Sequence, residues 1–337
     1  MPPHSGNRPV LLSRECKLHL TLASVKKDLH LFALISEIFT FQTTFHSMNT
    51  QFLDLPPEDW PFRTASHFVN CNGLRWHYQQ LGTGPTLLLL HGTGGSTHSW
   101  HHTLETLAEH FTVLVVDLPG HGFTIVPSNI DATRDVYSLE GMARELHALL
   151  ATLGLTPTLV AGHSAGVAVL LRLVLDGLVA PSRIVGFNPA LVAPPALYIA
   201  FIAPLLGAIV QTSVVADSGA WLARQTTVIR TMLQSTGSQL SADDLARYEL
   251  LCRRPTHVHA ALAMMSRWDL PRIVRDAISL RVPLTLVAGR NDRWVPLTAL
   301  EKSVARIPTA TLRVIEDAGH LLLEERPDEV VRTLLTP

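Results

Sequence analysis

Residues 158–166 are Thr-Leu-Val-Ala-Gly-His-Ser-Ala-Gly, and residues 167–175 continue as Val-Ala-Val-Leu-Leu-Arg-Leu-Val-Leu. The apolar residues before Gly162 predict a buried strand and those after Gly166 a buried helix, so Ser164 occupies a sharp strand-to-helix turn. Such a turn leaves no room for side chains two residues before and after the serine, which explains the two glycines. It exposes the serine hydroxyl at a helix N-terminus, where negative charge is stabilised. The stretch therefore predicts a nucleophilic serine.

A bare Gly-x-Ser-x-Gly pattern is weak evidence, because a chain of this length contains one by chance roughly one time in ten. A glycine-rich loop with a surface serine is the competing interpretation. The strand predicted before the serine and the helix predicted after it favour the nucleophile.

The composition is typical of a globular protein with a large core. Of the 337 residues, 47% are hydrophobic and 16% are charged, and the formal net charge is −1. This length predicts one large domain, or a core domain that carries an insertion. The balanced charge argues against a nucleic-acid partner, which would require a clustered basic face. The cysteines Cys16, Cys71 and Cys252 form no Cys-x-x-Cys pair, so we expect a reducing, cytoplasmic compartment.

The 17 histidines raise the question of a metal site. The closest pairs are His101-His102 and His257-x-His259, and neither has the i, i+4 spacing of a helical zinc site. No cysteine or carboxylate cluster accompanies them in the sequence. We therefore expect no metal and no cofactor.

The longest apolar stretch is Ala196–Val210, which contains Pro204. At about 15 residues it is shorter than the roughly 20 that a membrane-spanning helix needs. We expect it either to line an apolar pocket or to rest on a bilayer surface, which would make the protein peripherally membrane-associated.

The chain divides into regions of different pattern. Residues 1–47 lack a small-residue cleavage site after a clean apolar core, so a secretory signal is not expected. We expect an extension there, either a start-site artefact with Met48 as the true first residue or a poorly ordered helix. Residues 48–187 and 272–337 are predicted to form an α/β core, and residues 188–271, which hold helical stretches and no clear strand, a helical cap.

Strand and helix patterns alternate in the core, which predicts a mostly parallel, doubly wound α/β sheet. Asn72-Gly73 is a two-residue turn signal, so the first two strands are expected to pair as a hairpin. The predicted strands are 66–70, 74–80, 86–90, 112–116, 158–161, 183–187, 283–288 and 311–315. The predicted helices are 98–110, 138–153, 167–175, 296–306 and 327–335 in the core, and 197–210, 219–233, 241–252 and 258–268 in the cap.

A nucleophilic serine needs a base, and the base needs an acid that orients it. On a sheet of this kind the three follow in the order serine, acid, histidine. Asp292 lies in the loop after the seventh predicted strand and His320 in the loop after the eighth, so both fall at the same sheet edge as Ser164. The competing interpretations are a helix cap before Pro296 for Asp292 and an ordinary loop histidine for His320.

Two other positions compete for the role of the acid. Asp317 precedes His320 by three residues and is expected to shape the turn instead. The loop after the sixth predicted strand, where folds of this kind also place an acid, contains Asn188. Asp292 is therefore the expected acid.

The tetrahedral intermediate of acyl transfer needs backbone N–H donors for its oxyanion. We expect one donor from Ala165, directly after the nucleophile. The second is expected from the glycine-rich loop at residues 91–95, where the backbone can approach a ligand closely, and Thr93 is favoured with Gly94 as the alternative.

Two further residues near these loops have open roles. Trp100 is expected either to wall the pocket or to pack in the core. The stretch Asp117-Leu-Pro-Gly-His-Gly122 indicates a rigid turn, in which His121 is expected to be structural rather than catalytic.

These motifs together resemble the α/β-hydrolase superfamily, from about residue 60 to the C-terminus. The resemblance implies Ser164, Asp292 and His320 as the catalytic residues. Serine at the nucleophile position argues against the haloalkane dehalogenase and epoxide hydrolase branches, which have aspartate there. The matching motifs are His91-Gly92 with Trp100, Asp117-x-Pro-Gly-x-Gly122, Gly162-His-Ser-Ala-Gly166, Gly289-x-x-Asp292, and Gly319-His320 with Glu325-Arg-Pro327.

A narrower set of motifs is similar to the magnesium-chelatase accessory proteins of bacteriochlorophyll biosynthesis (the BchO type). This resemblance implies a role near magnesium insertion into protoporphyrin, with a tetrapyrrole as ligand and chelatase subunits as partners, but it supplies no reaction. The segment before Met48 departs from the pattern. The motifs are Pro57-Glu-Asp-Trp-Pro61, Gly73-Leu-Arg-Trp-His77, Thr97-His-Ser-Trp100, Pro119-Gly-His-Gly-Phe-Thr124, His163-Ser-Ala-Gly166, Gly237-Ser238, Ala261-Leu-Ala-Met-Met265 and Trp268-Asp-Leu270.

Three hypotheses for the function follow. The favoured one is a serine hydrolase of bacteriochlorophyll synthesis that acts on a tetrapyrrole or a related apolar ester. The second is an accessory protein that binds a porphyrin without catalysis. The third is a general carboxylesterase or C–C bond hydrolase of unrelated metabolism.

Overall fold

The structure is a computed structural model of the chain. It describes residues 55–130, 134–192 and 226–336. The predicted extension 1–47, Met48 and the apolar stretch Ala196–Val210 lie outside the described residues.

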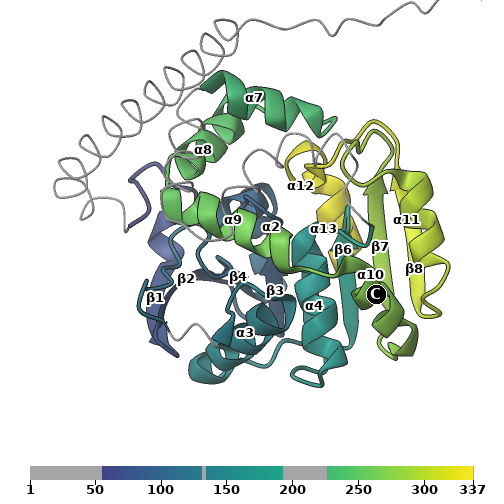
Figure 1. The fold of residues 1–337 in the computed structure, drawn as a ribbon, viewed down its shortest axis with the longest axis horizontal. Helices are drawn as coiled ribbons and strands as arrows, with labels where there is room; N and C mark the ends of the chain where they lie inside the picture. The colour runs from purple at the N-terminus through teal and green to yellow at the C-terminus, as the bar shows by residue number, and fades with distance from the viewer. Residues whose placement is uncertain (1–54, 131–133, 193–225, 337) are drawn as a thin grey trace, which may run out of the picture. The chain divides into compact units, whose positions relative to one another are not determined.

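An eight-stranded sheet organises the described core (Figure 1), with the strand order β1-β2-β4-β3-β5-β6-β7-β8. β1 pairs with β2 and β2 with β4 in antiparallel fashion, and all the other neighbours are parallel. This confirms the mostly parallel α/β sheet predicted from the sequence. The strands are β1 (Ser66–Cys71), β2 (Leu74–Leu81), β3 (Thr86–Leu90), β4 (Thr112–Val116), β5 (Leu159–His163), β6 (Arg183–Phe187), β7 (Leu284–Gly289) and β8 (Ala310–Ile315).

The predicted hairpin between β1 and β2 is confirmed. Cys71 and Leu74 are register partners, so only Asn72 and Gly73 form the turn. Both have positive φ, 51° and 76°, which is the geometry of the tight turn that Asn-Gly favours.

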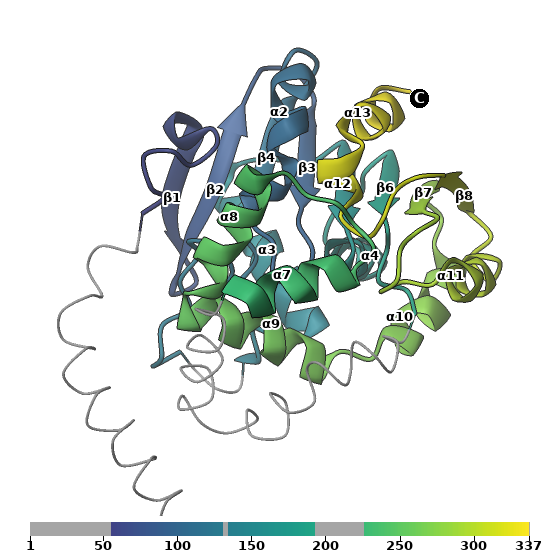
Figure 2. The same ribbon diagram turned by 90° about the horizontal axis from the view of Figure 1, so that it is seen from above.

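Helices cover both faces of the sheet (Figure 2), and each face has its own apolar core. One face packs against α3, α4 and α11, the other against α2, α12 and α13. Because both faces are covered, the central parallel strands are continuous apolar runs, as in β3, whose Leu87–Leu90 are fully buried. The helices are α2 (His101–Ala108), α3 (Leu139–Leu153), α4 (Ala165–Leu175), α11 (Leu297–Val304), α12 (Leu322–Glu325) and α13 (Pro327–Leu335).

Between β6 and β7 the described chain is helical, and Figure 1 shows α7, α8 and α9 together above the strands. The last of the helices here, α10, was not predicted, because Pro271 looks like a break. Proline is tolerated in the first helical turn, which is where it lies. The helices are α7 (Thr226–Ser235), α8 (Ala242–Cys252), α9 (Pro255–Arg267) and α10 (Leu270–Asp276).

The predicted helix 98–110 differs from the structure at its start. A 3₁₀ turn at Thr97–Trp100 comes first, capped by the Ser96 side chain, and α2 begins only at His101. Among the residues that the structure describes, no helix has both the length and the apolar character to cross a bilayer.

Candidate active site

The Ser164 turn has the strained geometry that the sequence predicts. Ser164 has φ 49° and ψ −114°, between the end of β5 and the start of α4. A Cβ at Gly162 would lie 2.7 Å from the Gly166 carbonyl carbon, and a Cβ at Gly166 would lie 2.7 Å from the Leu90 carbonyl oxygen. Any side chain at either position would therefore disrupt the turn.

Ser164, His320 and Asp292 are joined by hydrogen bonds. His320 Nε2 lies 3.0 Å from Ser164 Oγ, and His320 Nδ1 lies 2.8 Å from Asp292 Oδ2. All three side chains are at least nine-tenths buried. Three loops that follow β5, β7 and β8 thus bring the three predicted residues into one chain of contacts.

The helix cap that competed with this prediction is not formed, because α11 has Pro296 as its N-cap and no side chain caps it. Asp292 instead holds the turn that precedes this helix. Its Oδ1 accepts the N–H groups of Trp294 and Val295, each at 2.8 Å. Its Oδ2 is thereby directed to His320. Oδ1 therefore holds the turn at residues 292–295, and Oδ2 contacts the histidine.

The glycine-rich loop after β3 places Thr93 beside the serine. Thr93, Ser164, Ala165 and His320 line one cavity, whereas Gly94 is absent from the lining among the described residues. Ala165 is the first residue of α4, where backbone N–H groups have no acceptor within the helix.

The Gly92 carbonyl fixes the orientation of this loop. It accepts the His91 Nδ1–H at 2.7 Å and the Gly95 N–H at 3.0 Å. His91 Nε2 in turn accepts the Leu118 N–H at 3.0 Å. Because the peptide is planar and trans, anchoring the Gly92 carbonyl directs the Thr93 N–H to the opposite side.

The cavity has a volume of about 220 Å³ and an apolar wall. None of its described lining residues is an aspartate, glutamate, lysine or arginine. Trp268 Nε1 donates to the Tyr137 carbonyl at 2.9 Å and Trp294 Nε1 to Ser235 Oγ at 3.0 Å, so both indole N–H groups are engaged by the protein. The apolar lining residues are Ala190, Val192, Met264, Met265, Trp268, Leu270, Pro271, Trp294 and Val295.

A family model described as "Alpha/beta hydrolase family" matches residues 87–333. This match spans every strand from β3 to β8 and all three residues of the hydrogen-bonded chain. The chain belongs to the alpha/beta hydrolase family.

Individual relatives agree with the family. The "Magnesium-chelatase 30 kDa subunit" of Rhodobacter capsulatus is 36% identical over 278 residues, which cover 81% of this chain and 94% of the relative. The "Pimeloyl-[acyl-carrier protein] methyl ester esterase" of Aeromonas hydrophila is 28% identical and covers 76% of this chain and 96% of its own length. An alpha/beta hydrolase fold protein from Burkholderia ambifaria, whose crystal structure is known, matches with a TM-score of 0.67 and 25% identity, over 81% of this chain and 98% of that protein.

Residues that hold the three side chains in place were missed from the sequence. Asn188 stands where an acid was considered, and its amide joins the two loops. Its Nδ2 donates to the Gly319 and His320 carbonyls at 2.8 and 2.7 Å, and its Oδ1 accepts the Gly289 N–H at 2.7 Å. The His163 Nε2–H donates to the same His320 carbonyl at 2.7 Å.

The end of α7 lies between the acid loop and the base loop. The Thr236 carbonyl accepts the N–H groups of Arg293 at 3.1 Å and of His320 at 3.4 Å. Gly237 has φ 86°, and a Cβ there would lie 2.1 Å from the Asn291 carbonyl oxygen. The described chain between β6 and β7 therefore contacts both loops directly, at Thr236 and Gly237. These contacts run through backbone groups, which a sequence pattern cannot reveal.

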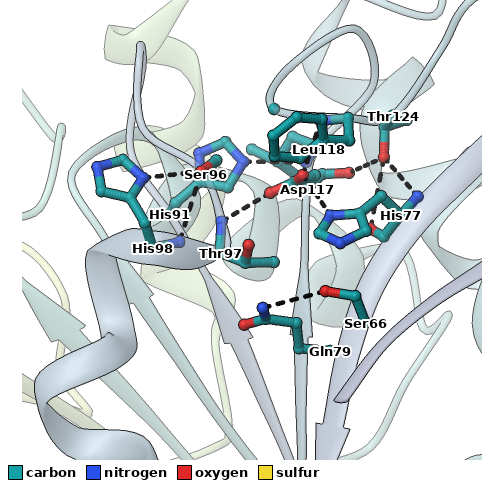
Figure 3. Close-up of polar contacts among 12 residues, drawn as sticks. Ser66, His77, Gln79, His91, Ser96, Thr97, His98, Asp117, Leu118 and Thr124 are labelled. Carbon is teal, nitrogen blue, oxygen red and sulfur yellow. Dashed lines mark hydrogen bonds and ion pairs between the residues drawn. The ribbon is translucent and has the colours of Figure 1, made fainter. Parts of the chain in front are cut away.

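A second buried His–Asp pair lies away from Ser164, and Figure 3 shows it around Asp117. Asp117 Oδ2 is 2.6 Å from His77 Nδ1 and accepts the Phe123 N–H at 2.9 Å, and Oδ1 accepts the Thr97 N–H at 2.6 Å. Burial opposes ionisation, but the charge and hydrogen bond of His77, together with His91 and the Phe123 N–H, lower the pKa of Asp117 to about 2. The pair connects β2, the 3₁₀ turn and the 117–124 loop.

The other residues considered from the sequence are Asp317, Trp100 and His121. Asp317 is exposed, unlike the buried Asp292. Trp100 is fully buried in the core between the sheet and α2, with its ring 6.0 Å from Phe187, so it packs in the core. His121 is fully buried, and its Nδ1–H donates to the Pro119 carbonyl at 3.2 Å.

One cluster corrects the statement that no carboxylate accompanies the histidine pairs. Asp244 of α8 lies 3.3 Å from both His101 and His102, and the three are close enough to hold a metal ion. The Arg247 guanidinium already donates to Asp244 at 2.8 Å and to His101 Nε2 at 3.2 Å. The Arg247 guanidinium thus already binds two of the three residues, and its contacts tie α8 to α2. The carboxylate comes from far along the chain, which is why the sequence did not reveal it.

Proposed function

We propose that this alpha/beta hydrolase is a serine hydrolase that cleaves an apolar, uncharged ester. The observation that carries the proposal is the buried hydrogen-bond chain from Asp292 through His320 to Ser164 at the wall of an apolar cavity. As Ser164 Oγ attacks the substrate carbonyl, His320 Nε2 takes its proton, and Asp292 stabilises the resulting imidazolium. His320 then protonates the leaving alcohol and later activates the water that hydrolyses the acyl-enzyme.

The N–H groups of Ala165 and Thr93 stabilise the oxyanion in this proposal. Ala165 offers a free donor at the start of α4, and the anchored Gly92 carbonyl aims the Thr93 N–H. Gly94 remains the alternative donor.

Residues 188–271 act as a cap over a core of residues 48–187 and 272–337. The contacts that support this role come from α9, whose Met264 and Met265 line the cavity, and from Thr236, which contacts the loops of Asp292 and His320.

The cavity chemistry limits the substrate. A carboxylate in this cavity would lose its hydration and find no cationic partner among the described lining residues, which is costly. The resemblance to the relative named magnesium-chelatase 30 kDa subunit supports a tetrapyrrole ester, with the ester bond in the cavity. We propose an esterified tetrapyrrole, rather than its free acid, as the substrate.

A second candidate function is a porphyrin-binding accessory protein that contacts chelatase subunits and does not use the serine. The name of the same relative, a magnesium-chelatase subunit, favours it. It predicts tetrapyrrole binding without turnover.

The test is a comparison of p-nitrophenyl butyrate with the p-nitrophenyl ester of succinate, whose free carboxylate is the only added charge. We expect kcat/KM to be at least about 100-fold higher for the neutral ester. The variant Met265→Arg, which adds a cation to the wall, should narrow this ratio. Equal rates for both esters would contradict the assignment of an uncharged substrate.

The same logic applies to the tetrapyrrole. Ser164→Ala protein, titrated by fluorescence, should bind protoporphyrin IX dimethyl ester more tightly than the free diacid, and the wild type should release the monoester or diacid. Tight binding of both forms without hydrolysis would support the accessory binding protein instead.

A further inference from the structure

His257 links the helical insertion between β6 and β7 to the loop of residues 91–95, which carries Thr93 and is called the oxyanion loop below. It lies in the first turn of α9 and is 1% exposed. Its Nδ1 is 3.0 Å from the Gly122 backbone nitrogen, and its Nε2 is 3.1 Å from the Gly94 carbonyl oxygen. One imidazole ring therefore bridges the 117–122 loop and the loop that carries Thr93.

The two contacts fix the tautomer of the ring. A backbone N–H can only donate, so Nδ1 must carry the lone pair and Nε2 the proton. Nε2–H then donates to the Gly94 carbonyl. Burial and the nearby His91 lower the pKa of His257 to about 3, so the neutral form that makes both bonds is the form present at neutral pH.

The peptide between Gly94 and Gly95 is held at both of its ends. Its N–H, from Gly95, donates to the Gly92 carbonyl at 3.0 Å, and its carbonyl, from Gly94, accepts the His257 Nε2–H. Gly94 has φ 74°, and a Cβ built there would meet no atom within 4 Å, so the space beside it is open. The bond from His257 therefore adds a restraint on the carbonyl side of this peptide.

The same helix also lines the substrate cavity. Met264 follows His257 by seven residues, close to two helical turns, so both project from one face of α9. Ala260 lies between them on this face and packs against Gly120, where an added Cβ would come within 2.6 Å of the alanine methyl. A single rigid helix face thus contacts both the oxyanion loop and the acyl cavity.

We propose that His257 is a positioning residue for the oxyanion hole: by holding the Gly94 carbonyl, its Nε2–H fixes the Thr93 N–H in line with the Ser164 carbonyl adduct. The inference rests on the proposed hydrolase activity. It assigns to the insertion a part in transition-state stabilisation as well as in enclosing the substrate.

Two substitutions separate the two bonds of the ring. In His257→Gln the amide nitrogen reaches the position of Nε2, so the Gly94 bond survives and the Gly122 N–H loses its acceptor. In His257→Asn the amide oxygen takes the position of Nδ1, so the Gly122 bond survives and the Gly94 carbonyl loses its donor. Each variant leaves one buried backbone group unsatisfied, so their stabilities should fall by similar amounts.

The two variants should differ in kcat although their free energies of unfolding are similar. With p-nitrophenyl butyrate we expect His257→Asn to lower kcat about 10- to 100-fold with little change in KM, because the lost interaction acts only in the transition state. His257→Gln should restore kcat to within about threefold of the wild type. His259→Asn, on the same helix but facing Tyr137, is the matched control and should leave kcat unchanged.

Backbone NMR of ¹⁵N-labelled protein provides a readout that needs no turnover. The Thr93 amide resonance should move in His257→Asn and stay near its wild-type position in His257→Gln. Equal losses of kcat in both variants, or an unmoved Thr93 amide in His257→Asn, would overturn the proposal. If the wild type hydrolyses no ester, the proposed function fails and the Thr93 resonance alone decides whether His257 positions the loop.

Discussion

The protein contains two buried His–Asp pairs that are built alike and placed differently. In each pair a histidine Nδ1 meets an aspartate Oδ2, at 2.6 Å for His77–Asp117 and 2.8 Å for His320–Asp292. In each pair the aspartate also accepts two backbone N–H groups. Hydrogen bonding within the pairs therefore does not distinguish them.

The difference lies beyond Nε2 of each histidine. His320 Nε2 reaches Ser164 Oγ at the cavity wall. His77 Nε2 is buried without a hydrogen-bond partner among the described residues, and its ring lies 5.0 Å from Phe68 and 5.3 Å from Phe123. We therefore propose that a His–Asp pair becomes reactive only beside a nucleophile and a cavity, and that without them it is a structural connection between loops.

The two pairs should differ most in their effect on kcat when each aspartate is changed to asparagine. Asp292→Asn keeps an oxygen for the two backbone N–H groups but removes the charge that stabilises the His320 imidazolium. We expect kcat to fall by about 10⁴ with a small change in stability. Steady-state hydrolysis of p-nitrophenyl butyrate measures it. Asp117→Asn, assayed per folded molecule, is the control and should stay within about threefold of the wild type; a comparable loss there would erase the distinction between the pairs.

The free energy of unfolding should respond in the opposite order, with a larger loss in Asp117→Asn than in Asp292→Asn. Asp117→Asn removes the charge beside the buried His77 and replaces one of the two acceptor oxygens by an NH₂ group, and we expect a loss of about 3–5 kcal/mol in the free energy of unfolding by urea. Because the folded pKa of Asp117, about 2, lies below the ordinary 3.8, its contribution is complete above about pH 4 and is lost as the pH falls toward 2. The variant should therefore have a flatter stability profile between pH 4 and 2. An unchanged unfolding midpoint at pH 7 would contradict the structural role.

A third buried acid, Glu324, differs from Asp117 and Asp292 because its side chain is bonded to a tyrosine hydroxyl instead of a histidine. The Tyr248 hydroxyl donates to its Oε1 at 2.7 Å, and burial raises the pKa of Glu324 to about 8. Since the folded pKa lies above the ordinary value, the folded state retains a proton that the unfolded state loses, and stability should decline as the pH rises from about 4.5 to 8. Glu324→Gln, which is neutral at every pH, should be more stable than the wild type at pH 8 by on the order of 1–3 kcal/mol and should match it near pH 4. Thermal unfolding across this range measures the difference, and parallel profiles for the two proteins would refute it.

The sequence predicted the reactive pair better than the structural one, for physical reasons. Ser164, Asp292 and His320 each follow a strand that its apolar pattern identifies, and the ends of parallel strands meet at one edge of the sheet. The pairing of His77 with Asp117 joins positions 40 residues apart on an antiparallel strand and a loop, and no local pattern encodes it. The sequence therefore identified Asp117 only as part of a rigid turn.

The residues that hold the site in place could not be predicted from the sequence, for a related reason. Asn188, the Thr236 carbonyl and His257 act through backbone groups of distant loops, and backbone contacts leave almost no trace in residue type. Asn188 gave one local signal, an amide where folds of this kind also place an acid. Gly237 gave another, since a glycine outside an obvious turn indicates close backbone approach.

The proposed function depends above all on Ser164 being an activated nucleophile. The most direct measurement is the stoichiometry of labelling by a fluorophosphonate, read by mass spectrometry of the intact protein and of the peptide that contains Ser164. We expect about one equivalent of label on this serine in the wild type and none in Ser164→Ala. Folded Asp117→Asn protein should be labelled as fully as the wild type. A folded wild type that takes up no label, or labels at another residue, would contradict it.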